Sequence, residues 1–123
     1  MKKIFLSLLF ITFCCTINAQ NVIDRQLIKD SPNAISPFID EDISLLSTTF
    51  NNISEVQLKE LQRLYYYKYK TLTSEITGEE LEAYVASVKE KMEEILGESL
   101  YTQISENQAL FDRVSGQVYI NQE

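Results

Sequence analysis

Three helix-start motifs constrain the fold of this chain more than any other feature of its sequence. In each motif a hydroxyl residue is followed, three positions later, by a glutamate or glutamine whose side chain can bond back to the backbone. This reciprocal pattern, the capping box, marks the first turn of a helix. The motifs pair Ser54 with Gln57, Thr77 with Glu80, and Ser105 with Gln108. Three predicted helix starts in a chain of 123 residues favour an all-α fold.

The spacing of apolar residues sets the extent of the predicted helices. Apolar side chains that recur every three or four residues give a segment one apolar face. Such segments predict helices over about 37–50, 55–75, 78–96 and 105–115. Gly97 and Gly116 follow the last two segments, where a left-handed glycine can end a helix. The predicted architecture is a small antiparallel bundle, or a helical hairpin cradle, of about four helices.

The first residues have the pattern of a signal peptide. Lys2 and Lys3 precede an apolar run over 4–13, and Ala19 offers a small residue at a plausible cleavage position. The run is too short to span a bilayer, which takes about 20 apolar residues. We therefore expect an exported protein, either periplasmic or secreted. The expected organisation is a signal peptide over 1–19, a flexible leader over 20–36, with a short helix around 22–29 as an alternative within it, and a single helical domain over 37–123.

Both cysteines of the chain, Cys14 and Cys15, fall within the predicted signal peptide. Cleavage would leave an exported domain without disulfides, and such a domain depends on packing alone, which favours regular helices. An alternative is that Cys14 or Cys15 carries a lipid, which would anchor the protein to a membrane. A diacylglyceryl mass on the exported protein would distinguish the two outcomes.

The residue types present argue against an enzyme. The chain has no histidine, no cysteine after the predicted cleavage and no glycine-rich loop that could hold phosphate. These absences remove the usual nucleophile and base pairs and the ordinary zinc site. Acidic residues cluster over 40–42 and 79–82, but without the spacing or turn glycine of a calcium loop. We expect no catalytic residue, no metal and no cofactor.

The net charge limits the classes of partner. Cleavage would remove Lys2 and Lys3 from the 11 basic residues and leave all 18 acidic ones, so the mature chain would carry nine basic residues and a formal charge of −9. Such a protein is repelled by nucleic acid and by anionic lipid. We therefore expect a protein partner, with no nucleic-acid binding and no membrane insertion after cleavage.

One stripe of residues on the predicted second helix is a candidate binding surface. Helical phase turns Tyr65 and Tyr69 inward, whereas Tyr66 and Tyr67 point to the flank and the outer face. The basic-aromatic stripe consists of Lys59, Arg63, Tyr66, Tyr67 and Lys70. With Lys68, its cations make four of the nine mature basic residues, and they fall within twelve positions. Such a stripe suits an acidic or aromatic partner. The other interpretation is that the cations only keep the outer face of the helix solvated and bind no partner.

Two of the helix-start motifs also resemble the signature of a known family. Ile53-Ser54-x-x-Gln57 and Ile104-Ser105-x-x-Gln108 stand where the small periplasmic LTxxQ proteins, Spy-like and CpxP-like, have Leu-Thr-x-x-Gln twice. The resemblance covers about residues 38–115 and is carried by these two stretches. It implies a helical, cradle-shaped homodimer that shields unfolding client proteins without ATP, or that senses envelope stress.

Two function classes follow. The first is a periplasmic chaperone-like or stress-responsive binding protein, and the second is a secreted structural or interaction module without chaperone activity. A thin helical layer that leaves Leu45, Leu64 or Tyr66 exposed beside an apolar groove would favour the first class. A bundle that buries every leucine, isoleucine and valine would favour the second.

Overall fold

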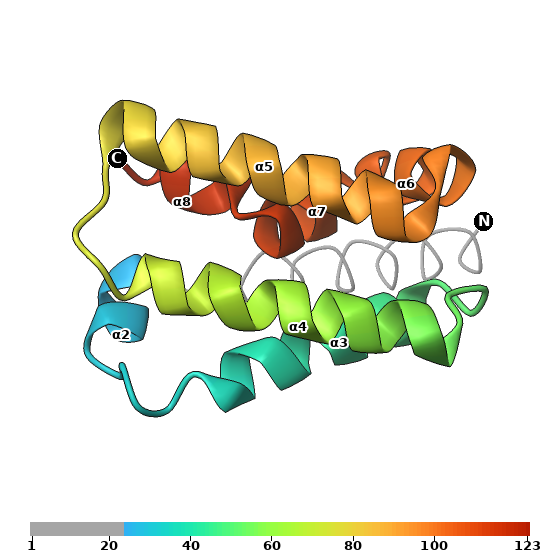
Figure 1. The fold of residues 1–123 in the computed structure, drawn as a ribbon, viewed down its shortest axis with the longest axis horizontal. Helices are drawn as coiled ribbons and strands as arrows, with labels where there is room; N and C mark the ends of the chain where they lie inside the picture. The colour runs from blue at the N-terminus through green and yellow to red at the C-terminus, as the bar shows by residue number, and fades with distance from the viewer. Residues whose placement is uncertain (1–23) are drawn as a thin grey trace, which may run out of the picture.

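The computed structural model describes residues 24–123, and this part of the chain is helical without any strand (Figure 1). It contains three long helices, α3 (Ser36–Thr49), α4 (Glu55–Leu72) and α5 (Gly78–Leu96), and four short ones, α2 (Arg25–Lys29), α6 (Glu98–Ser105), α7 (Gln108–Ser115) and α8 (Gln117–Asn121). The predicted all-α class is confirmed, but the described residues form seven helices where about four were expected. The predicted signal peptide, with Cys14 and Cys15, lies outside the described residues.

The long helices pack as consecutive antiparallel neighbours. In Figure 1, α4 runs back against α3, and α5 runs back against α4. The chain then returns along α5 through α6, α7 and α8, and α7 also contacts α3. The last predicted helix, over 105–115, corresponds to the shorter helix α7, and the short helices α6 and α8 come before and after it in the chain. Among the described helices, none combines the length and the apolar character that crossing a bilayer requires.

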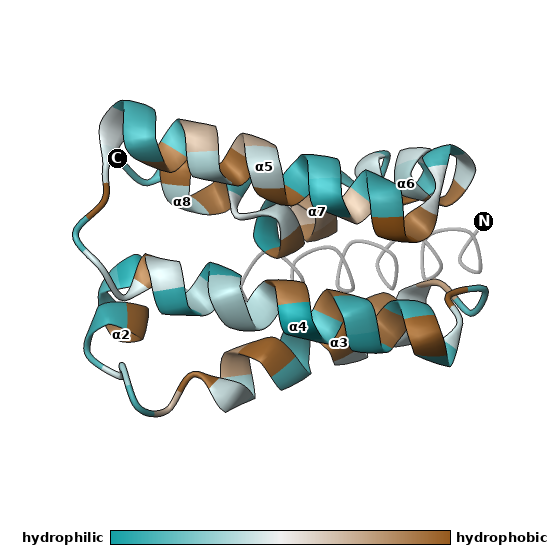
Figure 2. Cartoon of the chain, in the orientation of Figure 1, coloured by the Kyte–Doolittle hydropathy of each residue, from teal (hydrophilic) through white to brown (hydrophobic). Residues whose placement is uncertain are grey.

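The core lies between the long helices and the returning short ones. Hydrophobic and hydrophilic segments alternate along α3, α4 and α5 (Figure 2), as the predicted apolar faces require. The buried side chains on the predicted faces of α4 and α5 are Leu61, Tyr65, Tyr69, Leu72, Leu81, Val85, Val88 and Met92. Their burial places the opposite faces of α4 and α5 toward solvent.

The helix-start motif at Ser54 forms as a reciprocal capping box. The backbone N–H of Gln57 donates to Ser54 Oγ at 3.1 Å, and the Gln57 Oε1 accepts from the Ser54 N–H at 2.9 Å. Gln57 also donates from Nε2 to the carbonyl oxygen of Ile95 at 3.2 Å. One side chain therefore caps α4 and ties its first turn to the last turn of α5.

The other two predicted capping boxes are wrong. Thr77 makes no side-chain cap bond at the start of α5, where the N–H of Gly78 donates instead to Glu123 Oε1 at 3.1 Å. Ser105 is the last residue of α6, because Leu100 and Ile104 give that segment a buried helical face of its own. There the Ser105 hydroxyl donates to the Thr102 carbonyl at 2.7 Å.

The start of α7 is shifted accordingly. Asn107 is its N-cap and accepts from the N–H of Leu110 at 3.4 Å. Gln108 is the first helical residue, and its amide donates to Asp112 at 2.7 Å rather than to a cap. Glu80, the third residue of α5, likewise has no cap partner in Thr77. Only the first of the three motifs therefore works as a box.

The described part of the predicted leader, residues 24–36, is packed against the bundle. Asp24 caps α2 by accepting from the N–H of Gln26 at 3.0 Å, and Ile28 is fully buried. Arg25 donates to the carbonyl oxygens of Leu72 at 3.2 Å and Ser74 at 2.9 Å. These contacts attach α2 to the end of α4, which differs from the expected flexible segment; residues 20–23 lie outside the described residues.

Candidate functional site

The structure places the whole basic-aromatic stripe on the outward face of α4. Its five residues, Lys59, Arg63, Tyr66, Tyr67 and Lys70, are all exposed. Tyr66 and Tyr67 keep 44% and 58% of their surface in solvent, and they are two of the four large hydrophobic residues exposed in the described part. Their rings meet edge to face with centroids 5.4 Å apart, and Lys70 Nζ lies 6.0 Å from the centroid of the Tyr66 ring.

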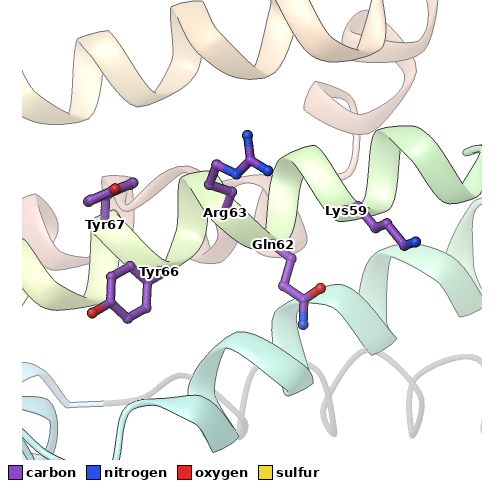
Figure 3. A pocket seen from close by; sticks show the side chains of 5 residues that line it. All are labelled: Lys59, Gln62, Arg63, Tyr66 and Tyr67. Carbon is purple, nitrogen blue, oxygen red and sulfur yellow. The ribbon is translucent and has the colours of Figure 1, made fainter.

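The stripe borders an open hollow, which we call the polar hollow. It has a volume of about 440 Å³ and is lined by Lys59, Gln62, Arg63, Tyr66 and Tyr67. Figure 3 shows Arg63 and Tyr67 on the side of α4 that faces α5, and Gln62 and Tyr66 on the side of α3. No aliphatic residue lines this hollow, so its chemistry is that of cations, an amide and two phenol rings.

A second hollow lies between α4 and α5, and we call it the apolar hollow. It has a volume of about 360 Å³ and is lined by Glu60, Arg63, Leu64, Tyr67, Lys91 and Ile95. Leu64 and Ile95 are half-buried and pack against the core, so they supply aliphatic surface. Arg63 and Tyr67 line both hollows, which makes the two hollows neighbours on one surface.

The exposed cations of the described residues gather around these two hollows. Of the nine basic residues there, only Lys59, Arg63, Lys70 and Lys91 are exposed. Within the described residues, neither Lys59 nor Arg63 forms an ion pair, and Lys91 makes only a surface pair with Glu94 at 3.7 Å. The positive charge that remains open to a partner is therefore concentrated at one place.

The other five basic residues, Arg25, Lys29, Lys68, Lys89 and Arg113, are buried or half-buried and make contacts within the molecule. The prediction that Lys68 adds to the surface charge is wrong, because this side chain is 1% exposed. Lys68 follows Tyr65 by three residues and precedes Leu72 by four, so it lies within the buried arc of α4. A partner on the stripe cannot reach it.

Lys68 belongs instead to a buried ionic cluster, formed by Asp42, Lys68, Tyr69 and Arg113. Lys68 Nζ and the Tyr69 hydroxyl each donate to Asp42 Oδ2 at 2.7 Å, and Arg113 Nε donates to Asp42 Oδ1 at 2.8 Å. At the edge of the cluster, Arg113 Nη1 pairs with Glu41 at 3.1 Å. Two cations thus face two carboxylates, and the cluster joins α3, α4 and α7.

The remaining contacts of Lys68 complete its coordination. Its ammonium group donates to the carbonyl oxygens of Val114 at 2.9 Å and Arg113 at 3.3 Å. It also lies 4.2 Å from the ring centroid of Tyr65 and 4.4 Å from that of Tyr69. Such cation–π contacts are strongest when the cation is desolvated, as it is here.

Burial and charge shift the titration of this cluster. Burial lowers the pKa of Lys68, while the charge and the hydrogen bond of Asp42 act in the opposite direction. Burial, followed by the charge of Asp42, raises the pKa values of Tyr65 and Tyr69 well above the ordinary value. The tyrosines are therefore neutral donors at physiological pH, and the hydroxyl of Tyr69 serves to hold the carboxylate of Asp42.

The cluster acts as a structural crosslink. Neither hollow on α4 is lined by its members, so nothing brings a substrate to Asp42 or Lys68 through those openings. Asp42 follows Ile39 by three residues and precedes Leu46 by four, so its position in the sequence falls on the apolar face of α3. This position is the sequence signal that indicates the burial of Asp42. Within the described residues, no group of three or more His, Cys, Asp or Glu side chains is placed to hold a metal.

Comparison with known proteins gives no relative from which to transfer a role. No protein-family model, no curated protein and no solved structure matches this chain.

Proposed function

We propose that this is an exported helical binding protein that recognises acidic segments of protein partners through the outward face of α4. The observation that carries the proposal is the clustering of charge: every exposed cation of the described residues lines or borders the two hollows on this face. Exposed tyrosines stand among these cations, and tyrosine and arginine are enriched where proteins bind one another.

The acidity of the rest of the molecule adds direction to this binding. The chain has a formal charge of −7, so an acidic partner is repelled over most of the surface. Attraction remains at Lys59, Arg63 and Lys70, and complementary charge of this kind raises association rates and selects orientation. Export rests on the Lys2 and Lys3 pattern with its apolar run, and places the partner in the periplasm or outside the cell.

An interaction module is the form of binding protein that the packing favours, although Leu27 and Val56 are exposed, so the bundle does not bury every leucine, isoleucine and valine. Leu45 and Leu64 are half-buried against the core, and the ionic cluster joins α3, α4 and α7 in the interior. The apolar hollow is small, at about 360 Å³, which suits a short segment of a partner. An extended apolar concavity, as a cradle for whole unfolding clients would need, is not among the hollows on α4.

A chaperone-like role is the second candidate, and one observation favours it. Tyr66 and Tyr67 are exposed, and Tyr67 lines a partly apolar hollow together with Leu64 and Ile95. An exposed aromatic ring beside aliphatic surface, as Tyr67 provides here, is the arrangement expected of a surface that holds unfolding chains. The resemblance of the Ser54 and Ser105 motifs to the LTxxQ family implies the same role and a homodimer, although only Ser54 forms a cap here.

A client-aggregation assay, with the oligomeric state measured alongside, tests both the interaction module and the chaperone-like role. The mature protein is added to an acidic client, reduced α-lactalbumin, and to a basic client, reduced lysozyme. A chaperone-like protein suppresses aggregation of the acidic client, whereas an interaction module binds acidic segments without suppressing it. Light scattering gives the monomer or dimer state of the same samples.

A variant set connects either outcome to α4. The quadruple variant Arg63→Ala, Tyr66→Ala, Tyr67→Ala and Lys70→Ala should keep its fold, because exposed substitutions each shift stability by about 0.5 kcal/mol or less, and it should lose binding to the acidic client. The matched control changes exposed acids on α5, Glu79→Gln, Glu82→Gln and Glu90→Gln, and should bind at least as well as the parent. Equal binding by the parent and the quadruple variant would retire the proposal.

A further inference from the structure

We infer that the apolar hollow is an anchor site for one apolar side chain of an acidic peptide segment, with the carboxylates of that segment on the polar hollow. This inference rests on the proposed function and narrows its partner to a short linear segment. It rests on the different side chains that line two neighbouring hollows, one polar and one partly apolar, which share Arg63 and Tyr67.

The two hollows differ in the groups they offer. The polar hollow presents Lys59, Gln62 and Arg63, which donate hydrogen bonds, whereas the apolar hollow adds the aliphatic chains of Leu64 and Ile95. A guanidinium group binds a carboxylate through two parallel hydrogen bonds, so the shared Arg63 is the natural carboxylate contact. An apolar side chain gains most where aliphatic surface is already partly shielded from water.

The size and position of the hollows limit the length of the segment. A volume of about 360 Å³ lies at the lower end of the range of about 300–1,000 Å³ for ligand pockets, which suits one apolar side chain together with the backbone on either side of it. Because Arg63 and Tyr67 line both hollows, the anchoring side chain and the carboxylates must lie close together in the partner. A short acidic segment with one central apolar residue meets this condition.

The apolar hollow is fixed before a partner arrives. Gln57 donates to the Ile95 carbonyl at 3.2 Å and so holds the end of α5 against the start of α4. About two turns further along α4, the Tyr65 hydroxyl contacts the sulfur of Met92 at 3.5 Å. A site held in its bound geometry loses less conformational freedom on binding.

Charge selects an acidic occupant over a neutral one. Arg63 and Lys91 line the apolar hollow with one carboxylate, Glu60, while Glu94 makes a surface pair with Lys91 from outside the lining, and Lys59 and Lys70 stand on the adjoining stripe. A basic segment would meet like charges at each of these positions. A second copy of this chain also carries acidic segments, and the experiment separates that case from a foreign segment.

Fluorescence anisotropy with three labelled peptides of equal length tests the inference. The first is an acidic peptide with a central leucine, the second has serine in place of that leucine, and the third has lysines in place of the acids. We expect the leucine peptide to bind most tightly and the serine peptide roughly 10- to 100-fold more weakly, the effect of burying one leucine. The lysine peptide should not bind, and added salt should weaken the first peptide. Equal affinity for the leucine and serine peptides would overturn the anchor.

Three variants locate the anchor. Ile95→Ala should reduce the preference for leucine over serine, whereas Val56→Ala, an exposed aliphatic change on α4 outside both hollows, should leave it intact. Circular dichroism checks the fold of each variant. If Ile95→Ala does not fold, Lys91→Glu tests the same rim from an exposed position and should weaken the leucine peptide at low salt. An unchanged affinity in the folded variants would refute the placement.

The failure of this inference can be told apart from failure of the proposed function. If no acidic peptide binds the parent, but the quadruple α4 variant still loses the acidic client, the anchor is wrong and the binding face stands. If neither peptide nor client binding depends on α4, both are wrong. A dimer of the parent that blocks binding of the leucine peptide and is lost in Ile95→Ala would assign the hollow to a second copy of the chain and would overturn the inference.

Discussion

Lys68 of α4 donates its ammonium group to the carboxylate of Asp42 on α3 at 2.7 Å, and both side chains are removed from solvent. The two residues are 26 positions apart in the sequence and approach only because α3 and α4 pack antiparallel. Desolvating two charges is costly, and here the cost is offset by further donors from Tyr69 and Arg113. The stability of the bundle should therefore depend on every member of the cluster being present.

Substitution of Lys68→Met should lower the free energy of unfolding by about 3–5 kcal/mol, the range for removing one partner of a buried ion pair. Asp42 would lose its ammonium partner, and two backbone carbonyls would lose their donor. Lys70→Met, on the exposed face of the same helix, is the matched control and should cost about 0.5 kcal/mol or less. Denaturant unfolding of the pair gives the comparison, and equal midpoints would contradict the buried placement.

Alkaline pH should destabilise the protein through its buried tyrosines. Burial raises the folded-state pKa values of Tyr65, Tyr69 and Tyr119 above the ordinary value of 10.0. A raised pKa contributes stability that is complete below pH 10.0 and is lost as the pH rises above it, because the unfolded chain releases its protons first. Each fully shifted tyrosine contributes a slope of about 1.4 kcal/mol per pH unit.

Lys68 acts in the opposite direction, since a lowered pKa makes the unfolded state bind more protons and stability rise with pH. Its contribution ends above its ordinary value of 10.5, where the unfolded lysine has also lost its proton. Above that value the tyrosines dominate. Chemical denaturation between pH 8 and pH 12 should show the decline, and Tyr119→Phe should make it shallower; a flat profile would refute the burial of these hydroxyls.

The capping motifs predict a difference between two hydroxyl residues. Ser54→Ala should cost about 1 kcal/mol, because it removes a side chain that accepts from the N–H of Gln57. Thr77→Ala is the matched control and should cost less, because Thr77 forms no side-chain cap bond. Thermal or denaturant melts of the two variants decide the order, and the reverse order would place the working cap at α5.

Gly116 should tolerate substitution less well than Gly78. Both have positive φ, 94° and 56°, where any other residue is strained by about 1–2 kcal/mol. At Gly116 a Cβ would also meet Val85 Cγ2 at 3.3 Å, whereas at Gly78 it would meet open space. Gly116→Ala should therefore lower the unfolding midpoint more than Gly78→Ala. If the two variants melt together, the packing of the α7–α8 turn on α5 is looser than described.

The long helices could be predicted from sequence because their signals are local. The box at Ser54 and the apolar spacing through Tyr65 and Tyr69 involve residues within a few turns of one another. The prediction for Ser105 was wrong since a hydroxyl residue followed by glutamine occurs by chance, and the buried Leu100 and Ile104 had already placed Ser105 inside a helix. Local patterns indicate which residues could cap a helix, and tertiary packing determines which of them do so.

The ionic cluster and the packed leader could not be predicted in the same way. Asp42, Lys68 and Arg113 come from three segments, and only the tertiary arrangement makes them neighbours. Their positions in apolar registers indicate burial, but charged side chains are almost never fully buried unless they are paired, and the partners lie in other segments of the chain. The exposed stripe was easier, because the surface position of Arg63 and Tyr67 follows from the phase of one helix.

The gathering of exposed cations around two hollows gives the molecule an electric dipole. Lys59, Arg63, Lys70 and Lys91 form its positive pole, and the acids spread over the remaining surface form its negative pole. In the field of a negatively charged neighbour such a body rotates before it touches, so that α4 leads the approach. Encounters at low ionic strength would then be selected by orientation, and a protein repelled on average could still be captured productively at first contact.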